Sequence, residues 1–483
     1  MDSLGTKLLH WFKSHEGTID EQYMGLAQLE GCGWSAVALK DIPKGHVLFE
    51  IPRSLLLSIR TCSLREKLSK TEWKKLGKGW TPLILCMMWE AAKGDESIWD
   101  GYLDTMQVTF DTPMFWSAID LEELQGATIA EKIGHEQADK EYIERLLPLV
   151  QSRPDIFNPV HVDKYYTLSQ FHIMGSRILS RSFHVEPWGG AEDDNEEKSE
   201  TATGEAVQTA QDADVSMESA RSASPAENED DASDDESDSD DEGENVEDVA
   251  MVPMADMLNA RYGGENAKLF YEPDVLKMIT TKPIAAGEQI WNTYGDPPNS
   301  DLLRRYGYVD ALGTGLGIVE LKGNTIVECA ATSLSEVDQK ERVDWWLEMG
   351  GDDTFTLEMS TLLPPALLSF TQLMLLSDSE WQQTQQKEKP PKPKSPEVYT
   401  RIREALTKRV EMYPTTLEDD ETELKSSLIS LNKRHALIIR IGEKRVLQAA
   451  LGELSELSGP TKKRKAENEG GARKKGKGSK SRQ

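Results

Sequence analysis

The sequence predicts an α+β protein in which a β-rich unit is split by a helical block and followed by a mostly α-helical C-terminal domain. Short β-type runs occupy residues 34–58 and return over 250–293. The apolar spacing is helical over about 72–183 and again beyond about 355. Strands and helices do not alternate along the chain, which excludes a doubly wound parallel sheet. A chain of 483 residues is long enough for two or three compact units joined by linkers.

The first β-type stretch, WSAVALKDIPKGHVLFEIPRSLLLS, is broken by Pro43, Gly45 and Pro52, which predicts hairpin strands. The helical block contains long amphipathic stretches such as PLILCMMWEAAKG and AEKIGHEQADKEYIERLLPLVQ. The C-terminal helical pattern is clearest in SSLISLNKRHALIIRIGEKRVLQAALGEL. The polar stretch 386–397 before it predicts a surface loop between two helices.

Two polar segments account for the uneven charge of the chain. Residues 192–248 hold 24 Asp or Glu against two Lys or Arg, a local charge of −22 within a total of −29. Residues 461–483 hold ten Lys or Arg against two Glu, a local +8, which leaves −15 elsewhere. The acidic stretch, about 189–249, has almost no apolar side chains, so it is predicted to be a disordered insertion looped out of one domain. A solvated spacer is the favoured interpretation, although its serines could accept phosphates.

The basic tail, 456–483, is also predicted to be disordered. Its cluster KKRK, Lys462–Lys465, follows Pro460 and resembles a nuclear import signal. It predicts binding to an import receptor and a nuclear location, with the cytoplasm as a second location. Such clusters also form nonspecific nucleic-acid contacts or solubilising tails. Direct nucleic-acid binding is not expected outside the tail.

Composition excludes several other classes of protein. No run of eighteen apolar residues occurs, and the N-terminal segment lacks the pattern of a signal peptide, so we expect neither a membrane span nor secretion. The four cysteines, Cys32, Cys62, Cys86 and Cys329, lie far apart without a CxxC pair or a Cys/His cluster. We therefore expect reduced thiols and no metal site.

Three segments contain residues suited to chemistry. EGCGW, Glu30–Trp34, has glycines at alternate positions before a strand pattern, which would allow close approach to a ligand, although such a pair is more often an ordinary turn. MVPMADMLNA is apolar but contains Asp256 and Asn259, which need polar partners if they are buried. In GEQIWNTYG and LLRRYGYV, Tyr294 and Tyr306 each precede a glycine that lets a phenol point into a cavity. Considered separately, each of these tyrosines is more often a core residue than a residue of a functional site.

Together and in this order, the three segments resemble the SET-domain protein-lysine methyltransferases of the branch typified by the Rubisco large-subunit methyltransferase. Within it the likeness is to the fungal ribosomal-protein lysine methyltransferases and their animal nuclear relative. MGSRILSRSF, 174–183, is similar to the SRxF segment of the family, and YPTTLEDDETEL to its C-terminal domain. The likeness covers about residues 20–190 and 250–450.

The resemblance implies a SET domain over 20–310, with a helical insert at about 72–188, and a helical substrate-binding domain over 311–455. It implies S-adenosyl-L-methionine as the cofactor and a basic protein as the substrate. We expect a monomer.

The resemblance also assigns roles to particular residues. Tyr294 matches the catalytic tyrosine, whose hydroxyl would orient the lysine nitrogen. The residues matching the cofactor site are Glu30, Gly31, Cys32, Gly33, Trp34, Asn259, Ala260 and Tyr306. The candidates for substrate contact are Trp99, Arg181, Asp256 and Tyr271. A core tryptophan is an equally good interpretation of Trp99, and a helix-end ion pair remains an alternative for Arg181.

One residue departs from the family pattern. The family usually has Asn-His where this chain has Asn259 followed by Ala260. The missing imidazole removes one ring contact, which affects cofactor affinity more than activity.

Methyl transfer to lysine places few demands on side-chain chemistry. An unperturbed lysine has a pKa of about 10.4, so only about 0.04% is neutral at pH 7. A narrow apolar channel beside a positive sulfonium would lower that pKa by desolvation and like-charge repulsion. Alignment of the two reactants supplies the remaining acceleration.

The expected substrate follows from the family resemblance alone. On the resemblance, we expect mono-methylation of a large-subunit ribosomal protein in the nucleus, with a chromatin or nuclear regulatory protein as the alternative. A non-catalytic SET-fold peptide-binding protein is a further alternative; Ala260 favours it, whereas the presence of Tyr294 and Tyr306 opposes it. The last alternative function is that of an acidic chaperone or nucleic-acid adaptor that acts through the two charged segments.

Overall fold

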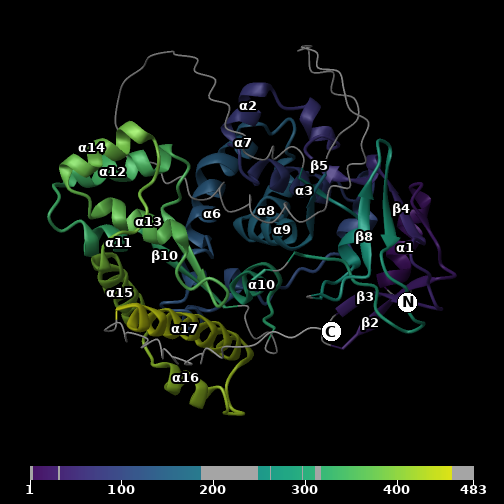
Figure 1. The fold of residues 1–483 in the computed structure, drawn as a ribbon. Coiled ribbons are helices and arrows are strands. Elements are labelled where there is room, and N and C mark those ends of the chain that lie inside the picture. Colours follow the sequence, from purple (N-terminus) through teal and green to yellow (C-terminus); the bar gives the residue numbers. More distant parts are fainter. Residues whose placement is uncertain are drawn as a thin grey trace, which may run out of the picture. The chain divides into compact units, whose positions relative to one another are not determined.

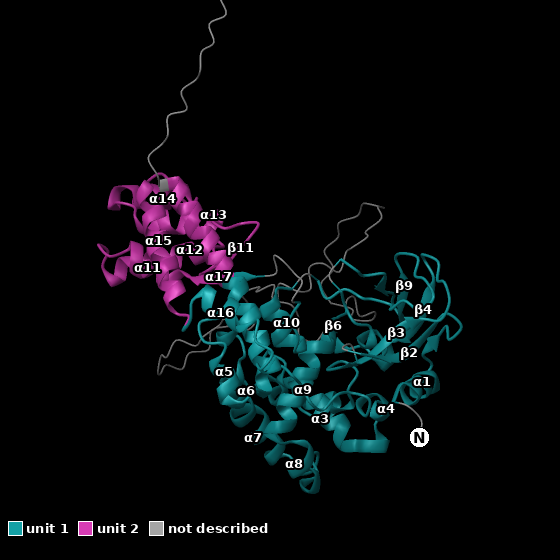
Figure 2. Cartoon of the chain, turned by 90° about the horizontal axis from the view of Figure 1, so that it is seen from below, with its two compact units in different colours: residues 1–318, 414–443 teal, residues 319–413, 444–483 magenta. Residues whose placement is uncertain are grey.

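The computed structural model, drawn in Figure 1, describes residues 4–30, 33–185, 249–261, 263–295, 297–310 and 317–458. The predicted acidic insertion and basic tail lie almost entirely outside the described residues. The chain divides into two compact units, coloured separately in Figure 2: unit 1 is 1–318 with 414–443, and unit 2 is 319–413 with 444–483.

Small antiparallel sheets form the β part of unit 1. Its strands are β1 Thr18–Ile19, β2 Met24–Leu29, β3 Gly33–Ala38, β4 Val47–Pro52, β5 Leu57–Ser58, β6 Ser182–His184, β7 Val249–Met251, β8 Ala267–Tyr271 and β9 Val275–Thr280. They pair in the orders β1-β4-β9-β8, β2-β3 and β5-β7-β6. Because β6 and β7 are neighbours, the chain leaves and re-enters the described residues on adjacent strands of one sheet. This is the arrangement expected for an insertion within a single unit.

The strands predicted over 34–58 form, and β3 is a hairpin strand, but its partner β2 lies before the predicted stretch. Strand β3 pairs with β2, with Leu29 opposite Gly33 at the turn. Strand β4 pairs instead with β9 and β1. Strand propensity reflects how a residue fits a pleated surface and says nothing about a partner on the far side of a long helical block.

The helical block confirms the predicted period. The helices of unit 1 are α1 Leu4–Ser14, α2 Lys70–Lys75, α3 Thr81–Lys93, α4 Asp100–Leu103, α5 Ala118–Glu122, α6 His135–Glu141, α7 Leu147–Ser152, α8 Pro159–Tyr165, α9 Leu168–Arg181, α10 Asn299–Tyr306 and α16 Leu417–Glu423. Short 3-10 turns occupy 53–55, 63–66, 94–96, 113–115, 128–131 and 255–257, and a π-helical turn at 142–146 joins α6 to α7. Thr167 caps α9 by accepting from the Gln170 amide at 3.2 Å.

The core of unit 1 joins the strands to helix α3. Leu48, Phe49 and Ile51 of β4 are at most 1% exposed, and Leu83 and Met87 of α3 are fully buried. Most of α3 is apolar and buried, which explains why the sequence shows a continuous apolar run there.

Gly17→Ala is expected to lower the free energy of unfolding by about 1–3 kcal/mol, the usual cost of overpacking a core. A methyl group at this position would lie 2.6 Å from the ring of Phe12, which is fully buried and cannot move aside. Urea denaturation followed by tryptophan fluorescence measures the change. Gly79→Ala is the matched control, since its methyl group would meet no atom within 4 Å. Equal stability of the two variants would contradict the packing described for Phe12.

Residues 414–443 pack with unit 1 through a buried ion pair. Arg440, on helix α17 Leu431–Ser458, donates to both carboxylate oxygens of Asp420, at 3.2 and 2.8 Å. It also donates to the backbone carbonyl of Glu123, at the end of α5, at 2.8 Å. The predicted domain limits of 20–310 and 311–455 stay predictions; among the compact units, α17 begins in unit 1 and continues in unit 2.

Unit 2 is mostly helical. It contains α11 Gly323–Ala330, α12 Glu336–Glu348, α13 Pro365–Met374, α14 Asp378–Lys387 and α15 Pro396–Glu411, with the strand pair β10 Ile318–Lys322 and β11 Thr354–Glu358. Val398, Ile402 and Leu406 form a fully buried stripe at four-residue spacing along α15. The predicted surface loop lies between α14 and α15, as expected. Across the described ranges, no helix combines the length and apolar character needed to cross a bilayer.

Candidate active site

The segment after β7 adopts an unusual backbone. Met254 has φ 71° and is fully buried, although a non-glycine residue rarely adopts a positive φ. It begins the 3-10 turn 255–257, which contains Asp256. Such conformations persist only where the surrounding packing enforces them, and they concentrate at functional sites.

Asp256 lies in a buried polar cluster formed by three elements. Its Oδ2 atom accepts a hydrogen bond of 2.8 Å from the hydroxyl of Tyr102 on α4. Arg181, the last residue of α9, donates to the Asp256 backbone carbonyl at 2.9 Å and lies 3.5 Å from Oδ2. The Asp256 Oδ1 atom is buried and has no hydrogen-bond partner among the described residues. A buried carboxylate oxygen of this kind is suited to receive a donor from a bound molecule.

Asp256→Asn tests the electrostatic state of this cluster. Burial raises the pKa of the Asp256 carboxyl above its ordinary value of 3.8, against the opposing effects of Arg181 and Tyr102. The folded state therefore binds this proton more tightly than the unfolded state does. The contribution of the Asp256 carboxyl to the free energy of unfolding is fully present below the ordinary pKa and is lost as pH rises through the folded-state pKa. The neutral amide does not titrate. The stability of the variant relative to the wild type should thus increase from acid to neutral pH, as measured by urea denaturation; a constant difference would contradict the raised pKa.

Two tyrosines from separate segments stack beside this cluster. The rings of Tyr294 and Tyr306 lie 4.4 Å apart between centroids and 10° from parallel. The Tyr294 hydroxyl donates to the backbone carbonyl of Leu258 at 3.3 Å. Burial raises the pKa of Tyr294, opposed by the charge of Arg181, so the phenol is protonated at neutral pH. Helix α10 ends at Tyr306 because Gly307 takes the left-handed conformation, with φ 79°.

Asn259 and Ala260 join the tyrosine segment to strand β3. The Asn259 side-chain amide donates to Ser35 Oγ at 2.9 Å, and its backbone carbonyl accepts from the Asn292 amide at 2.9 Å. Ala260 forms an isolated parallel bridge with Asn292, two residues before Tyr294. The predicted pair 259–260 thus lies between the opening strand and the tyrosine segment.

The opening motif is described only in part. Gly31 and Cys32, two of the predicted cofactor residues, lie outside the described residues. Glu30 is exposed at the end of the β2–β3 hairpin, and Gly33 starts β3 with φ 68°, a conformation that favours glycine. The Trp34 ring packs against Gly5 of α1, where an added methyl group would lie 2.8 Å from it. The cofactor roles of Glu30, Gly33 and Trp34 stay predictions.

Trp99 and Tyr271 are the two remaining predicted substrate residues. Trp99 is 3% exposed and donates to the Leu55 carbonyl at 2.9 Å, which favours the core interpretation, and its substrate contact stays a prediction. Tyr271, at the end of β8, is half-buried, and burial raises its pKa to about 12, with Arg53 opposing the shift. No described hydrogen bond or ring contact links Tyr271 to Tyr294.

The structure adds partners that the sequence analysis missed. Tyr102 and Ser35 contact Asp256 and Asn259, and Asn292 pairs with the 259–260 segment. Tyr308 extends the aromatic group, with its ring 6.3 Å from that of Tyr306. The sequence Tyr306-Gly307-Tyr308 within LLRRYGYV could have indicated Tyr308. Nothing in the sequence indicated Tyr102 or Ser35, because each lies far along the chain from its partner.

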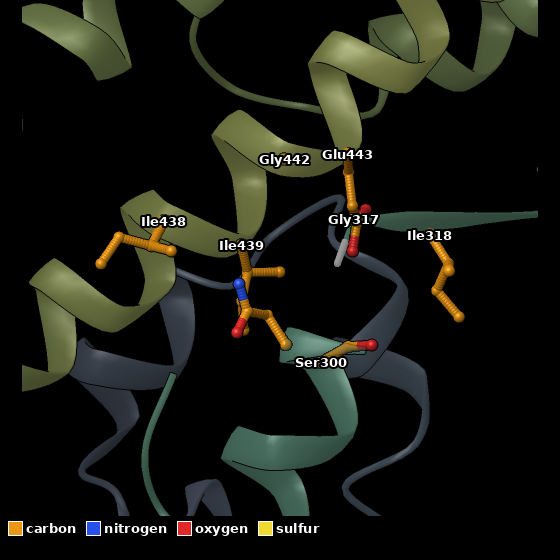
Figure 3. A pocket seen from close by; sticks show the side chains of 8 residues that line it. Ser300, Gly317, Ile318, Ile438, Ile439, Gly442 and Glu443 are labelled. Carbon is orange, nitrogen blue, oxygen red and sulfur yellow. The ribbon is translucent and has the colours of Figure 1, made fainter. Parts of the chain in front are cut away.

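A small cavity lies elsewhere in unit 1, between α10 and α17 (Figure 3). Its lining residues are Asn299, Ser300, Gly317, Ile318, Ile438, Ile439, Gly442 and Glu443. A volume of about 10 Å³ accommodates at most one water molecule, so this cavity does not serve as a cofactor site.

Family models match two regions of the chain. Residues 33–295, more than half of the sequence, match the model of the SET domain. The chain therefore belongs to the SET-domain family. Residues 335–447 match the model described as Rubisco LSMT substrate-binding, which identifies the branch more narrowly and confirms the resemblance found in the sequence.

Similar proteins carry lysine methyltransferase names. The chain is 31% identical over 301 residues to "Ribosomal lysine N-methyltransferase 4" of Saccharomyces cerevisiae, covering 61% of this chain and 53% of the relative. It is 30% identical over 348 residues to "N-lysine methyltransferase setd6" of Danio rerio, covering 70% and 64%. These matches span about half of the yeast relative and less than two thirds of the zebrafish one. The Mus musculus SETD6 match is 24% identical and covers 87% of this chain and 84% of the relative.

Solved structures confirm the α+β fold class. A Rubisco LSMT structure described as bound to AdoMet superposes with a TM-score of 0.64 at 20% identity, covering 95% of this chain and 93% of that one. An LSMT structure described as bound to lysine and AdoHcy superposes with a TM-score of 0.65 at 21% identity, covering 94% and 92%. At these identities the likeness establishes the fold.

Proposed function

We propose that this chain transfers a methyl group from S-adenosyl-L-methionine to the side-chain amine of a lysine in a protein. The observation that carries the proposal is the stacked pair of Tyr294 and Tyr306 beside the buried Asp256–Arg181 cluster, within the region matching the SET domain. The lysine methyltransferase names of the relatives support the same reaction.

The chemistry of the tyrosine pair fits a positively charged donor. Aromatic faces and a buried carboxylate oxygen favour a sulfonium or an amine over an anion. Asn259, the backbone at Ala260, and the β2–β3 turn are the groups we expect to hold S-adenosyl-L-methionine. When bound, it supplies the methyl group as an electrophilic carbon on sulfur. The missing histidine after Asn259 reduces the number of contacts and is expected to weaken affinity.

Tyr294 is the residue we propose to position the substrate amine. The lysine must lose its proton before it can act as a nucleophile, and an apolar site lowers its pKa by desolvation. A protonated Tyr294 donates to the Leu258 carbonyl, which leaves an oxygen lone pair able to accept from the lysine nitrogen. The flat stacked rings would then restrict the amine to one approach.

We propose a large-subunit ribosomal protein, mono-methylated in the nucleus, as the substrate. The yeast relative's name supports a ribosomal target. The charge of −15 outside the two polar segments and the acidic stretch favour a basic partner, as ribosomal proteins are. The KKRK cluster supports nuclear import through a receptor, and we propose that the chain acts as a monomer.

The test combines the purified full chain with labelled S-adenosyl-L-methionine and extracts of cells that lack the protein. Ribosomal and nuclear non-ribosomal fractions are assayed separately, and calorimetry measures donor binding in parallel. Label in one ribosomal protein, located to a lysine by mass spectrometry, is the expected result. Label confined to the non-ribosomal fraction would overturn the ribosomal substrate. Donor binding without label in either fraction would favour the non-catalytic peptide-binding alternative.

A further inference from the structure

Helices α6 and α9 bring together three side chains that the proposed methyl transfer does not use. His135 and Asp139 are one turn apart on α6, and His172 lies on α9. Asp139 Oδ1 accepts from His172 Nε2 at 2.8 Å, and Asp139 Oδ2 lies 3.4 Å from His135 Nδ1. The two imidazole rings are 4.9 Å apart between centroids.

We propose that His135, Asp139 and His172 bind a divalent transition metal, with Zn²⁺ as the best match. One potential ligand atom from each residue lies within 4.8 Å of the other two. Tetrahedral Zn²⁺ with ligands at about 2.1 Å requires ligand atoms about 3.4 Å apart. Rotation of the His135 side chain, which is 48% exposed, can close the remaining gap without moving either helix.

The ligand set decides the class of metal. Two imidazoles and one carboxylate favour Zn²⁺ and neighbouring transition metals over Ca²⁺ or Mg²⁺, which prefer oxygen ligands. Three protein ligands leave the fourth position to water. The exposed His135 provides access from solvent, whereas His172, with a side chain 10% exposed, anchors the site in the fold.

One feature limits the affinity of this site. Metal-bound histidines usually donate their second ring nitrogen to an acceptor, and loss of such a partner typically weakens binding 10–100-fold. His172 Nδ1 is buried and has no hydrogen-bond partner among the described residues. We therefore expect binding weaker than that of a structural zinc site, in the micromolar range.

The site is distinct from the tyrosine pair. His172 precedes Arg181 by nine residues on α9, or about 13 Å along the helix. Zinc binding would connect α6 to α9 and so stabilise the helical block whose last residue, Arg181, contacts Asp256. The proposal does not depend on methyl transfer, because its readout is metal binding itself.

The test titrates the full chain with Zn²⁺ against a chromophoric chelator, in a large excess of Mg²⁺ that saturates nonspecific carboxylate sites. One Zn²⁺ per chain is expected. When Co²⁺ replaces Zn²⁺, the protein should show a visible absorption band typical of tetrahedral coordination. His135→Gln should weaken Zn²⁺ binding at least tenfold and leave the melting temperature without metal unchanged, since His135 is exposed. His10→Gln, an exposed histidine outside the cluster, should bind as the wild type does.

Two results would overturn the proposal. One is Zn²⁺ affinity in His135→Gln equal to that of the wild type. The other is the absence of stoichiometric binding by the wild type in excess Mg²⁺. Circular dichroism of each variant verifies that a loss of binding does not come from a loss of fold.

Discussion

Tyr294→Phe is expected to lower kcat for lysine methylation about a hundredfold while changing the free energy of unfolding by about 1 kcal/mol or less. The variant retains the ring stacked on Tyr306 and removes only the hydroxyl that contacts the Leu258 carbonyl. Loss of a single hydrogen bond has a small effect on stability. Misplacement of a reacting group, by contrast, can cost about two orders of magnitude in rate. Initial rates with labelled donor, at saturating donor concentration, measure the change.

The matched control for this variant is Tyr165→Phe. Tyr165 ends helix α8 in the helical block, and its hydroxyl contacts only a neighbouring lysine, Lys164, among the hydrogen bonds found there. It should retain wild-type kcat. If Tyr294→Phe also retained wild-type kcat, Tyr294 would not be the positioning group and the stacked pair would be a packing feature.

The largest effect on stability is expected from Asp420→Ala. Arg440 is 2% exposed, and Asp420, its carboxylate partner, is fully buried. Removing one partner of a buried ion pair typically costs about 3–5 kcal/mol, and the Glu123 carboxylate, 3.4 Å from Arg440 Nη1, offsets only part of the charge left behind. Asp420 also accepts from the Thr415 hydroxyl at 2.6 Å, so a second hydrogen bond is lost. Thermal unfolding by calorimetry should show a lower transition temperature for unit 1.

Glu21→Ala provides the comparison with an exposed pair. Glu21 contacts Lys13 at 2.7 Å, but both side chains are about half exposed, and such pairs contribute about 1 kcal/mol or less. A similar small effect for Asp420→Ala would show that Arg440 finds adequate compensation from Glu123, and the account of how residues 414–443 join unit 1 would need revision.

The fold class could be predicted because the signals were local. The apolar period of α3 and α9, and the short runs that became β4 and β9, are properties of contiguous residues. The pairing of β4 with β9 could not be predicted from propensity, since their register depends on packing across the helical block. For the same reason, the buried contact of Arg440 with Glu123 carried no signal in the sequence.

The site was predictable where a motif carries it. Tyr294, Tyr306 and Asn259 lie in segments that the family resemblance identifies, and the structure places the two tyrosines in contact. The sequence left two interpretations open for Trp99, because an aromatic residue near an active site and an aromatic core residue have the same sequence signature; its burial in the structure agrees with the core interpretation. The cluster of His135, Asp139 and His172 could not be predicted because its third member, His172, comes from a second helix 33 residues beyond Asp139.

The most direct test of the central claim is the chemical identity of the product. Protein labelled by the full chain with radioactive S-adenosyl-L-methionine is hydrolysed to amino acids, which are separated beside methyl-lysine and methyl-arginine standards. Label in methyl-lysine is expected with the wild type and should be nearly absent with Tyr294→Phe. Label in another amino acid, or none with any basic protein offered, would contradict the central claim.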